Sequence, residues 1–266
     1  MENKNLAIVG CGKLAGIIAG AFNKGLLPNY QFKAAYSRSR ESAQKFVEKI
    51  ASFQKNACKV CTNPEEMLAV KPDIIVEAAN PEAFKKIALP ALEMGISIVT
   101  LSIGAFADED FLKKVEAACQ KSGAKVYVAS GAIGGFDILK TVSLMGPSKA
   151  AIHTTKGPNS LKGTSVYQKE MQQEKRKVFE GNAKEAIALF PTKVNVAVAA
   201  SLASVGTEKM DVSITSVPDY IGDDHRIEIE NEQVKAVVDV YSKTSEIAGW
   251  SVVHSLRNIA SPIVFH

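Results

Sequence analysis

The stretch Asn5-Leu-Ala-Ile-Val-Gly-Cys-Gly-Lys-Leu-Ala-Gly16 decides the fold of the first half of the chain. Residues 6–9 are an apolar run typical of a buried strand, and the run ends in two closely spaced glycines, Gly10 and Gly12. A helical pattern of apolar residues begins directly after them, at Leu14 and Ile17. A strand, a glycine turn and a helix in this order predict the opening of a dinucleotide-binding fold.

Each position of the glycine turn has a physical role in this prediction. Gly10 allows the tight turn, Gly12 lets the backbone approach a pyrophosphate because it has no Cβ, and Ala15 holds the close-packing third position. The phosphates are expected on the N–H groups at the positive end of the helix. We therefore predict a nicotinamide cofactor on Gly10, Gly12, Lys13, Leu14 and Ala15. The alternative is a glycine turn in another kind of α/β protein.

Composition narrows the class of protein. With 266 residues, of which 46% are hydrophobic, the chain can bury one large core or two of ordinary size. The net charge of +4 is mild and the basic residues are scattered, so we expect no nucleic-acid surface. No apolar run approaches the ~20 residues that cross a bilayer, so we expect no membrane partner. The first strand begins so early that we also expect no signal peptide.

The four cysteines, Cys11, Cys58, Cys61 and Cys119, indicate reduced thiols and hence a cytoplasmic protein. Cys58 and Cys61 form a C-x-x-C pair. A zinc site needs two further ligands, and no matching pair lies nearby in the sequence. We therefore predict no metal and interpret these cysteines as small buried side chains rather than as a metal or redox site.

The end of the second predicted strand, residues 32–36, bears on the choice of cofactor. NAD-selective proteins place an acidic residue there to bind the ribose 2′-hydroxyl. This chain has Ser37 and Arg38 instead, and an arginine flanked by hydroxyls can bind a 2′-phosphate. We therefore predict NADP as the preferred cofactor, with NAD as the alternative. If Arg38 is an ordinary solvated charge, the protein does not discriminate strictly between NADP and NAD.

Strand and helix patterns alternate through the first 130 residues. We expect helices at residues 42–52, 81–94 and 108–121 and strands at residues 57–61, 73–77, 96–101 and 124–128. This alternation predicts a doubly wound, parallel α/β sheet, the Rossmann domain, over residues 1–130. The small residues after the strand at 73–77 let the chain pass close to a nicotinamide ribose, so Ala79 and Asn80 join the predicted cofactor site.

The pattern changes after a glycine-rich crossing at residues 130–135. We expect strands at residues 150–155 and 210–216, helices at 182–190 and 194–205, and a hairpin of residues 225–230 and 234–241. This combination predicts a C-terminal α+β domain on a mixed sheet, over residues 131–242, for substrate binding and dimerisation. The last segment, residues 243–266, contains an apolar-periodic helix that we expect to pack back near the domain boundary.

A histidine is the natural group for reversible proton transfer near neutral pH. Of the four in the chain, His225 follows the polar loop of residues 219–224 and opens a predicted strand. From its position alone we hold it as a candidate acid/base, the alternative being a plain loop histidine.

The chain resembles a known family, the L-aspartate dehydrogenases, over nearly its whole length. The matching stretches are Ala129-Ser-Gly-Ala-Ile-Gly-Gly-Phe-Asp-Ile-Leu139, Thr154-Thr-Lys-Gly-Pro-Asn-Ser-Leu161, Phe179-Glu-Gly-Asn-Ala-Lys-Glu-Ala-Ile-Ala-Leu-Phe-Pro-Thr-Lys-Val-Asn195, His225-Arg-Ile-Glu-Ile229 and Lys243-Thr-Ser245. Two departures stand out. Ser37 and Arg38 replace the acidic residue that the family often has, and Tyr241 and Ser242 replace an Asn-Pro pair.

The resemblance implies roles for particular residues. Ala132 and Asn195 match positions that contact the cofactor, and His225 matches the proposed catalytic histidine. The alternatives are packing in a tight crossing for Ala132 and a helix cap for Asn195.

The resemblance also implies an activity, the NAD(P)-dependent oxidative deamination of L-aspartate to iminoaspartate or oxaloacetate and ammonia, or the reverse reaction. We hold Thr155, Lys156, Lys243 and Thr244 as candidates for binding the substrate carboxylates. A homodimer is expected, because an open mixed sheet often covers its free face with a partner. The alternatives are another NADP-dependent imine or semialdehyde reductase and a non-catalytic NADP-binding regulator.

Overall fold

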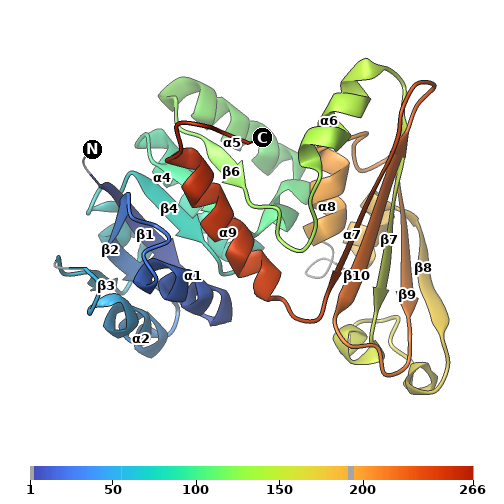
Figure 1. Ribbon diagram of the computed structural model, residues 1–266, viewed down its shortest axis with the longest axis horizontal. Coiled ribbons are helices and arrows are strands. Elements are labelled where there is room, and N and C mark those ends of the chain that lie inside the picture. The colour runs from blue at the N-terminus through green and yellow to red at the C-terminus, as the bar shows by residue number, and fades with distance from the viewer. Residues whose placement is uncertain (1–2, 55, 191–194, 266) are drawn as a thin grey trace. The chain divides into compact units, whose positions relative to one another are not determined.

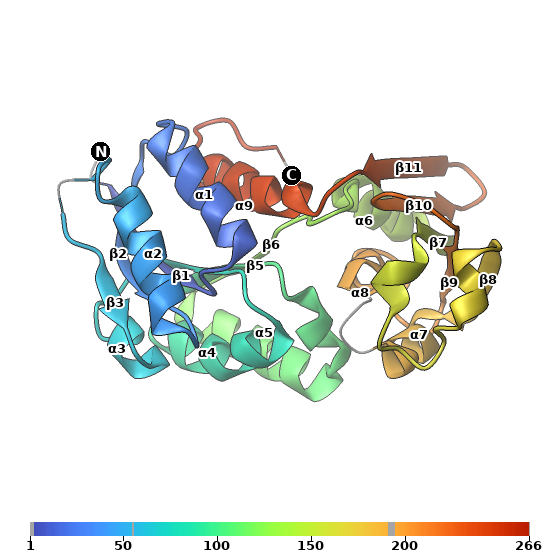
Figure 2. The same ribbon diagram turned by 90° about the horizontal axis from the view of Figure 1, so that it is seen from below.

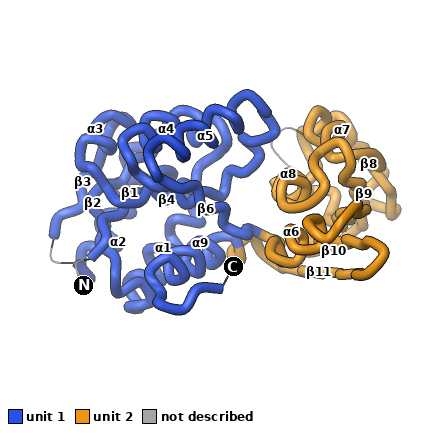
Figure 3. The backbone as a smooth tube through the Cα atoms, turned by 90° about the horizontal axis from the view of Figure 1, so that it is seen from above, with its two compact units in different colours: residues 1–131, 248–265 blue, residues 132–247, 266 orange. Residues whose placement is uncertain are grey.

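The computed structural model describes residues 3–54, 56–190 and 195–265, which form two compact units (Figure 3). The first unit comprises Met1–Gly131 and Ala248–Phe265, and the second comprises Ala132–Ile247. Each unit is built on one β-sheet. The chain therefore leaves its first unit once and returns to it through its last helix.

The sheet of the first unit has six strands in the order β3-β2-β1-β4-β5-β6. They are β1 (Lys4–Val9), β2 (Tyr30–Tyr36), β3 (Lys59–Cys61), β4 (Ile74–Glu77), β5 (Ser97–Thr100) and β6 (Val126–Val128). Neighbouring strands are parallel throughout, which confirms the predicted doubly wound Rossmann fold. The strand order reverses between β1 and β4, and such a switch opens a ligand crevice at the carboxyl ends of the strands.

Helices cover both faces of this sheet (Figure 2). One face carries α1 (Lys13–Asn23), α2 (Arg40–Ile50) and α9 (Glu246–Ile259), and the other carries α4 (Pro81–Glu93) and α5 (Glu109–Ser122), with the short α3 (Pro64–Leu68) beside β3. The late helix α9 is held by specific contacts. Gly249 has no Cβ and lets Ile17 of α1 approach, and the hydroxyl of Tyr30 donates to the carbonyl of Leu256 at 2.6 Å.

The second unit has a five-stranded mixed sheet in the order β11-β10-β7-β9-β8. The strands are β7 (Lys149–Lys156), β8 (Arg176–Asn182), β9 (Met210–Ser216), β10 (Asp223–Glu230) and β11 (Lys235–Ser242). β7 and β9 run parallel and the other pairs are antiparallel. The helices α6 (Phe136–Met145), α7 (Ala183–Leu189) and α8 (Asn195–Leu202) lie on one face (Figure 1), which confirms the predicted α+β architecture.

Three details differ from the predicted elements or lie outside the described residues. The edge strand β8 is absent from the prediction, because none of its side chains is fully buried and its register shifts between Lys177 and Phe179. β10 begins at Asp223, two residues before its predicted start, so its first residues are not loop. Val194, the predicted first residue of the helix at 194–205, lies outside the described residues.

Candidate active site

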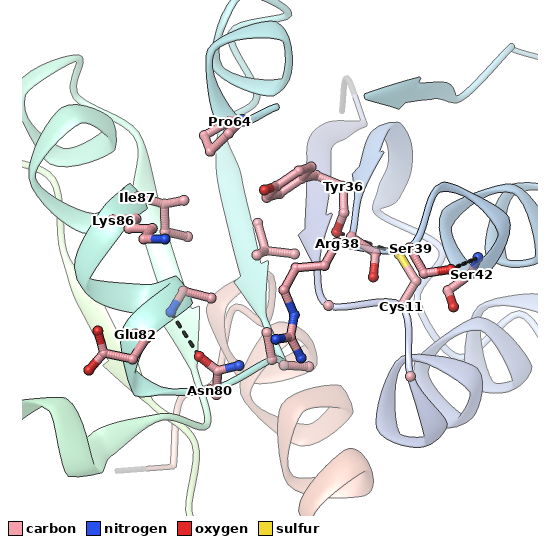
Figure 4. Close-up of a pocket in the computed structure, with 17 residues that line it drawn as sticks. Cys11, Tyr36, Arg38, Ser39, Ser42, Pro64, Asn80, Glu82, Lys86 and Ile87 are labelled. Atoms are coloured by element: carbon pink, nitrogen blue, oxygen red, sulfur yellow. Dashed lines mark hydrogen bonds between the residues drawn. The ribbon is translucent and has the colours of Figure 1, made fainter. Parts of the chain in front are cut away.

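A cavity of ≈ 680 Å³ opens at the carboxyl ends of the first unit's strands (Figure 4). Its walls come from the β1–α1 turn, the β2–α2 turn and the start of α4. Six residues predicted to bind the cofactor line it, namely Gly10, Gly12, Ser37, Arg38, Ala79 and Asn80. The structure thus brings together three segments that lie far apart in the sequence.

Gly10 is the position where the turn tolerates no side chain. Its φ is +87°, a left-handed value that glycine adopts without strain. A Cβ at Gly10 would lie 2.6 Å from the Cβ of Ala79 and 2.7 Å from its Cα. The turn after β1 therefore packs directly on the segment after β4, and these two walls of the cavity are fitted to each other.

Gly12 differs from Gly10, because a Cβ built there meets nothing within 4 Å. Gly12 lines the cavity and is the N-cap residue of α1, so the first backbone N–H groups of an 11-residue helix follow it. A backbone cradle with open space and a helix N-terminus fits the pyrophosphate of a dinucleotide. Ala15 is fully buried in the core behind the cavity, and neither it nor Lys13 or Leu14 lines the cavity.

The wall formed by the β2–α2 turn is cationic and rich in hydroxyls. Arg38 follows the end of β2 and extends into the cavity (Figure 4). Ser37 and Ser39, its neighbours in sequence, also line the cavity. Ser39 caps α2 by accepting a hydrogen bond from the Ser42 backbone N–H at 3.2 Å. This wall carries no carboxylate, as the local sequence predicts.

Several residues that line the cavity are absent from the site predicted from the sequence. The opposite wall contributes Pro64, Glu82 and Lys86. Glu82 and Lys86 stand four residues apart on α4, so one face of this helix presents both. Helical spacing after the capping residue Asn80 is the signal that could have found Glu82 and Lys86.

The cysteines in and near this cavity have no reactive character. Burial raises the pKa of the Cys11 thiol to about 12, and its sulfur donates to the Tyr36 carbonyl at 3.7 Å. Burial, with the neighbouring Cys11 and Cys61, also raises the pKa of Cys58 to about 12. Among the described residues, no three His, Cys, Asp or Glu side chains are grouped so that they could hold a metal ion.

In the second unit, His225 lies on the face of the sheet that the helices cover. It is 3% exposed and stands opposite Thr154 of β7 and Val240 of β11. Its Nδ1 lies 3.0 Å from the hydroxyl oxygen of Thr154. This hydrogen bond orients the ring and occupies Nδ1.

A charged pair accompanies the histidine. The Lys156 ammonium lies 3.5 Å from the Asp223 carboxylate, and these residues stand opposite each other on β7 and β10. Burial lowers the pKa of His225 from 6.5 to about 4, the charge of Lys156 lowers it further, and Asp223 opposes the shift. His225 is therefore a neutral imidazole at neutral pH and can accept a proton.

The lowered pKa has a consequence for stability. The unfolded chain binds a proton at His225 below about pH 6.5 and the native protein does so only near pH 4, so this residue destabilises the fold progressively as the pH falls between these values. At ~1.4 kcal/mol per pKa unit, the loss is on the order of 3 kcal/mol. We expect denaturant titrations at about pH 7 and about pH 4.5 to show a smaller loss for His225→Leu than for the natural protein.

The matched control is His254→Leu, because His254 is exposed on α9. That variant should lose as much stability on acidification as the natural protein. An equal acid loss for His225→Leu and the natural protein would contradict the assignment of a neutral buried histidine.

A polar pocket of ≈ 270 Å³ lies within the same unit. Three chain segments and the separate residue Gln172 form it, and two glycines let the segments pack closely. A Cβ on Gly157 would lie 2.4 Å from the Tyr220 carbonyl oxygen, and one on Gly222 would lie 2.8 Å from the Cα of Lys243. The lining residues are Gly157, Pro158, Asn159, Ser160, Gln172, Asp219, Tyr220, Gly222, Asp223, Lys243, Thr244 and Ser245.

The four predicted carboxylate-binding residues separate into three groups. Lys243 and Thr244 line the polar pocket, and Lys156 reaches it through the ion pair with Asp223, which also lines it. Thr155 does not join them. Alternation along β7 places Thr155 on the face of the sheet opposite to that of Thr154 and Lys156.

Two further predicted cofactor contacts, Ala132 and Asn195, belong to the second unit. Ala132 is half-buried in the crossing before α6, and Asn195 is the first residue of α8. The cavity of the first unit is lined without them.

Comparison with known proteins gives consistent matches over the whole chain. Residues 10–129 match the family model "Homoserine dehydrogenase, NAD binding domain", and residues 137–259 match "Aspartate dehydrogenase, C-terminal". L-aspartate dehydrogenases of Methanococcus maripaludis and Methanosarcina acetivorans are each 32% identical to this chain over 97% of both proteins. The crystal structure of aspartate dehydrogenase from Thermotoga maritima superposes with a TM-score of 0.74, at 28% identity and full coverage of both chains. No helix among the described residues is long and apolar enough to span a membrane.

Proposed function

Because the chain belongs to the L-aspartate dehydrogenase family of NAD(P)-dependent amino-acid dehydrogenases, we propose that it oxidises L-aspartate and releases ammonia. The Cα–H leaves as hydride and the amine loses a proton, which gives iminoaspartate. Addition of water and loss of ammonia then give oxaloacetate. The observation that carries this proposal is the neutral, oriented His225 beside Lys156 and a polar pocket in the second unit.

The first unit supplies the cofactor site. When bound, the oxidised nicotinamide dinucleotide supplies the hydride acceptor. The Gly10–Gly12 turn and the start of α1 would hold the pyrophosphate, and the Ala79–Asn80 segment would border the ribose. Ala132 and Asn195 remain proposed cofactor contacts on the strength of the family resemblance.

The polar pocket suits the two carboxylates of aspartate. Lys243 offers an ammonium group there, and Thr244 and Ser245 offer hydroxyls directly before α9, a 14-residue helix. Charge-assisted hydrogen bonds of this kind are stronger than those between neutral groups. Thr244 already accepts from the Glu246 backbone N–H at 3.2 Å, which fixes the hydroxyl at the start of the helix. We propose Lys243, Thr244 and Lys156 as carboxylate partners and leave out Thr155, whose side chain is on the opposite face of the sheet.

In this mechanism, His225 accepts and releases a proton. With its own proton on Nδ1 and Thr154 accepting the hydrogen bond, Nε2 carries a lone pair that can take a proton from the attacking water. The nearby Lys156 charge disfavours the imidazolium that results, so the proton is readily passed on. Proton transfer by a positioned base of this kind is the role that the family resemblance assigns to this residue.

We also propose that NADP is preferred, and Arg38 is the residue that tests it. Arg38→Ala should raise the Kd of NADP about 10–100-fold, because a charge-assisted contact to the 2′-phosphate is lost. The Kd of NAD should change less than about threefold, since NAD lacks that phosphate. Fluorescence titration with both reduced cofactors measures this. Arg40→Ala is the control, because Arg40 begins α2 and does not line the cavity. Equal losses for both cofactors would refute the assignment.

A substrate panel tests the reaction itself. The protein is incubated with NADP or NAD and L-aspartate, L-glutamate, L-alanine or L-homoserine, and the absorbance of the reduced cofactor is followed. We expect kcat/KM for aspartate to exceed the others at least about tenfold, which corresponds to one additional charged contact. Lys243→Met should raise the KM for aspartate while leaving the cofactor Kd unchanged.

Two results of this panel would favour the alternatives. Turnover of another amine or of a semialdehyde, without aspartate, would indicate a related reductase. Cofactor binding without any turnover would indicate a regulator.

We further propose a cytoplasmic homodimer. The face of the second sheet that carries no described helix exposes Val237 and Tyr241, at 42% and 51%, and a second copy of the chain would cover them. The four free cysteines support a reducing compartment.

A further inference from the structure

One ionisable side chain of the first unit is completely buried and has no part in the scheme above. Glu77 is the last residue of β4 and is 0% exposed. Its Oε1 accepts from the Ala79 backbone N–H at 2.7 Å and from the Ser102 hydroxyl at 2.9 Å, and its Oε2 accepts from the Thr100 hydroxyl at 2.6 Å. Burial raises the pKa of Glu77 above its ordinary value, and these hydrogen bonds offset part of that rise.

The donors around Glu77 are arranged for an acceptor-only group. The Thr100 oxygen itself accepts from the Ser102 backbone N–H at 3.0 Å, so its hydroxyl proton is directed to the carboxylate. A carboxylate can accept from every side, whereas an apolar residue of similar size would leave the Ala79 N–H and the buried hydroxyls of Thr100 and Ser102 without their acceptor. The site is thus built to hold a carboxyl group in one orientation.

Of the three donors, the Ala79 N–H belongs to the cavity wall. Ala78, Ala79 and Asn80 all line the cavity. Ala79 is also the residue that closes on Gly10, with 2.6 Å from its Cβ to the position that a Gly10 Cβ would take. The far end of the segment is fixed separately, because the Asn80 side chain accepts from the Ala83 N–H at 2.9 Å. Glu77 therefore fixes the Ala79 end of the Ala78–Asn80 wall. The position of this wall in turn limits the position of the glycine turn at Gly10.

We propose that Glu77 is a positioning residue for the cofactor: through the Ala79 N–H, its carboxylate sets the position of the Ala78–Asn80 wall against the Gly10 turn. Cofactor affinity then depends on the reach of the side chain at position 77. The bonds to Thr100 and Ser102 hold the carboxyl group itself at the end of β5 and contribute to stability.

The test measures the Kd of the reduced cofactor by fluorescence titration, without any amino acid, together with Tm. Glu77→Asp keeps the charge but is one methylene too short to reach Ala79, so Kd should rise about tenfold or more for the lost hydrogen bond. Glu77→Gln keeps an oxygen for the Ala79 N–H, and its Kd should stay within about threefold of the natural value. The KM for the cofactor should follow Kd in both variants, while the KM for aspartate stays unchanged.

Ser102→Ala is the matched control, because it removes one hydrogen bond to the same carboxylate and leaves the Ala79 contact in place. It should lower Tm with Kd unchanged. The proposal is overturned if Glu77→Asp lowers Tm without raising the cofactor Kd. It is also overturned if Ser102→Ala raises the cofactor Kd as much as Glu77→Asp does. If Glu77→Asp does not fold, Glu77→Gln alone decides, since a rise in Kd beyond about threefold at normal Tm would show that charge, not reach, is what matters. Because the deciding readouts, the cofactor Kd and Tm, are taken without any amino acid, the outcome is independent of the substrate proposed above.

Discussion

Replacing His225 by alanine is expected to lower kcat for aspartate oxidation about 10²–10⁴-fold, the usual contribution of a positioned acid/base. The residue is buried, held at Nδ1 by Thr154, and neutral because burial and Lys156 lower its pKa to about 4. No other described histidine shares these features. His153 hydrogen-bonds to Ser213 and is exposed on the opposite face of its sheet, and His254 is exposed on α9. Steady-state kinetics under saturating cofactor measures the effect.

Affinity for the cofactor should persist in His225→Ala, because the cavity of the first unit contains none of the residues around His225. A fluorescence titration checks this and separates catalysis from binding. His153→Ala serves as the control and should retain kcat within about threefold. Partial rescue of His225→Ala by added imidazole would support a proton-transfer role. Turnover close to that of the natural protein would remove His225 from the mechanism.

The second large effect contrasts the two glycines of the opening turn. Gly10→Ala should destabilise the protein by about 2 kcal/mol or more, because its Cβ would overlap Ala79 at 2.6 Å and its φ of +87° is strained for alanine. Gly12→Ala should leave stability nearly unchanged, since its Cβ meets nothing within 4 Å. The added methyl group then occupies cavity space beside the start of α1, so the Kd of the cofactor should rise at least about tenfold.

Chemical denaturation and cofactor titration measured on both variants separate these two effects. Gly20→Ala is the control, because Gly20 lies inside α1, does not line the cavity and also meets nothing within 4 Å. It should stabilise the protein by about 0.5–1 kcal/mol through helix propensity and leave Kd unchanged. Normal cofactor affinity in Gly12→Ala would show that the pyrophosphate does not approach this turn.

The two halves of the chain differ in how far their fold could be predicted. In the first half, most strands are short apolar runs that end near glycine or small residues, and the longer helices are amphipathic, so local pattern indicates the order of elements and hence a parallel sheet. In the second half, β8 was not predicted, because the half-exposed side chains of this edge strand show little alternation between apolar and polar residues. The return of α9 to the first unit depends on contacts such as Ile17 with Gly249, more than 200 residues apart in the chain.

The candidate sites show the same division. The residues of the glycine turn and of the β2 end follow from local sequence, because strand ends of a parallel sheet converge. Pro64 was missed, since only the packing of α3 against the sheet brings it to the cavity. Thr155 and Lys156 are adjacent in sequence, yet only the buried face of β7 decides which of them stands with His225.

Local sequence is enough to predict the Rossmann architecture, the glycine turn and the absence of a carboxylate after β2, because each depends on residues within one strand–turn–helix step. The neutrality of His225 and the role proposed for Glu77 follow only from the folded protein. Both depend on desolvation and on partners brought in from other strands, as Thr154 and Lys156 are for His225 and Thr100 is for Glu77. A pKa and a hydrogen-bond network are set by distances through space, and the chain acquires those distances only when it folds.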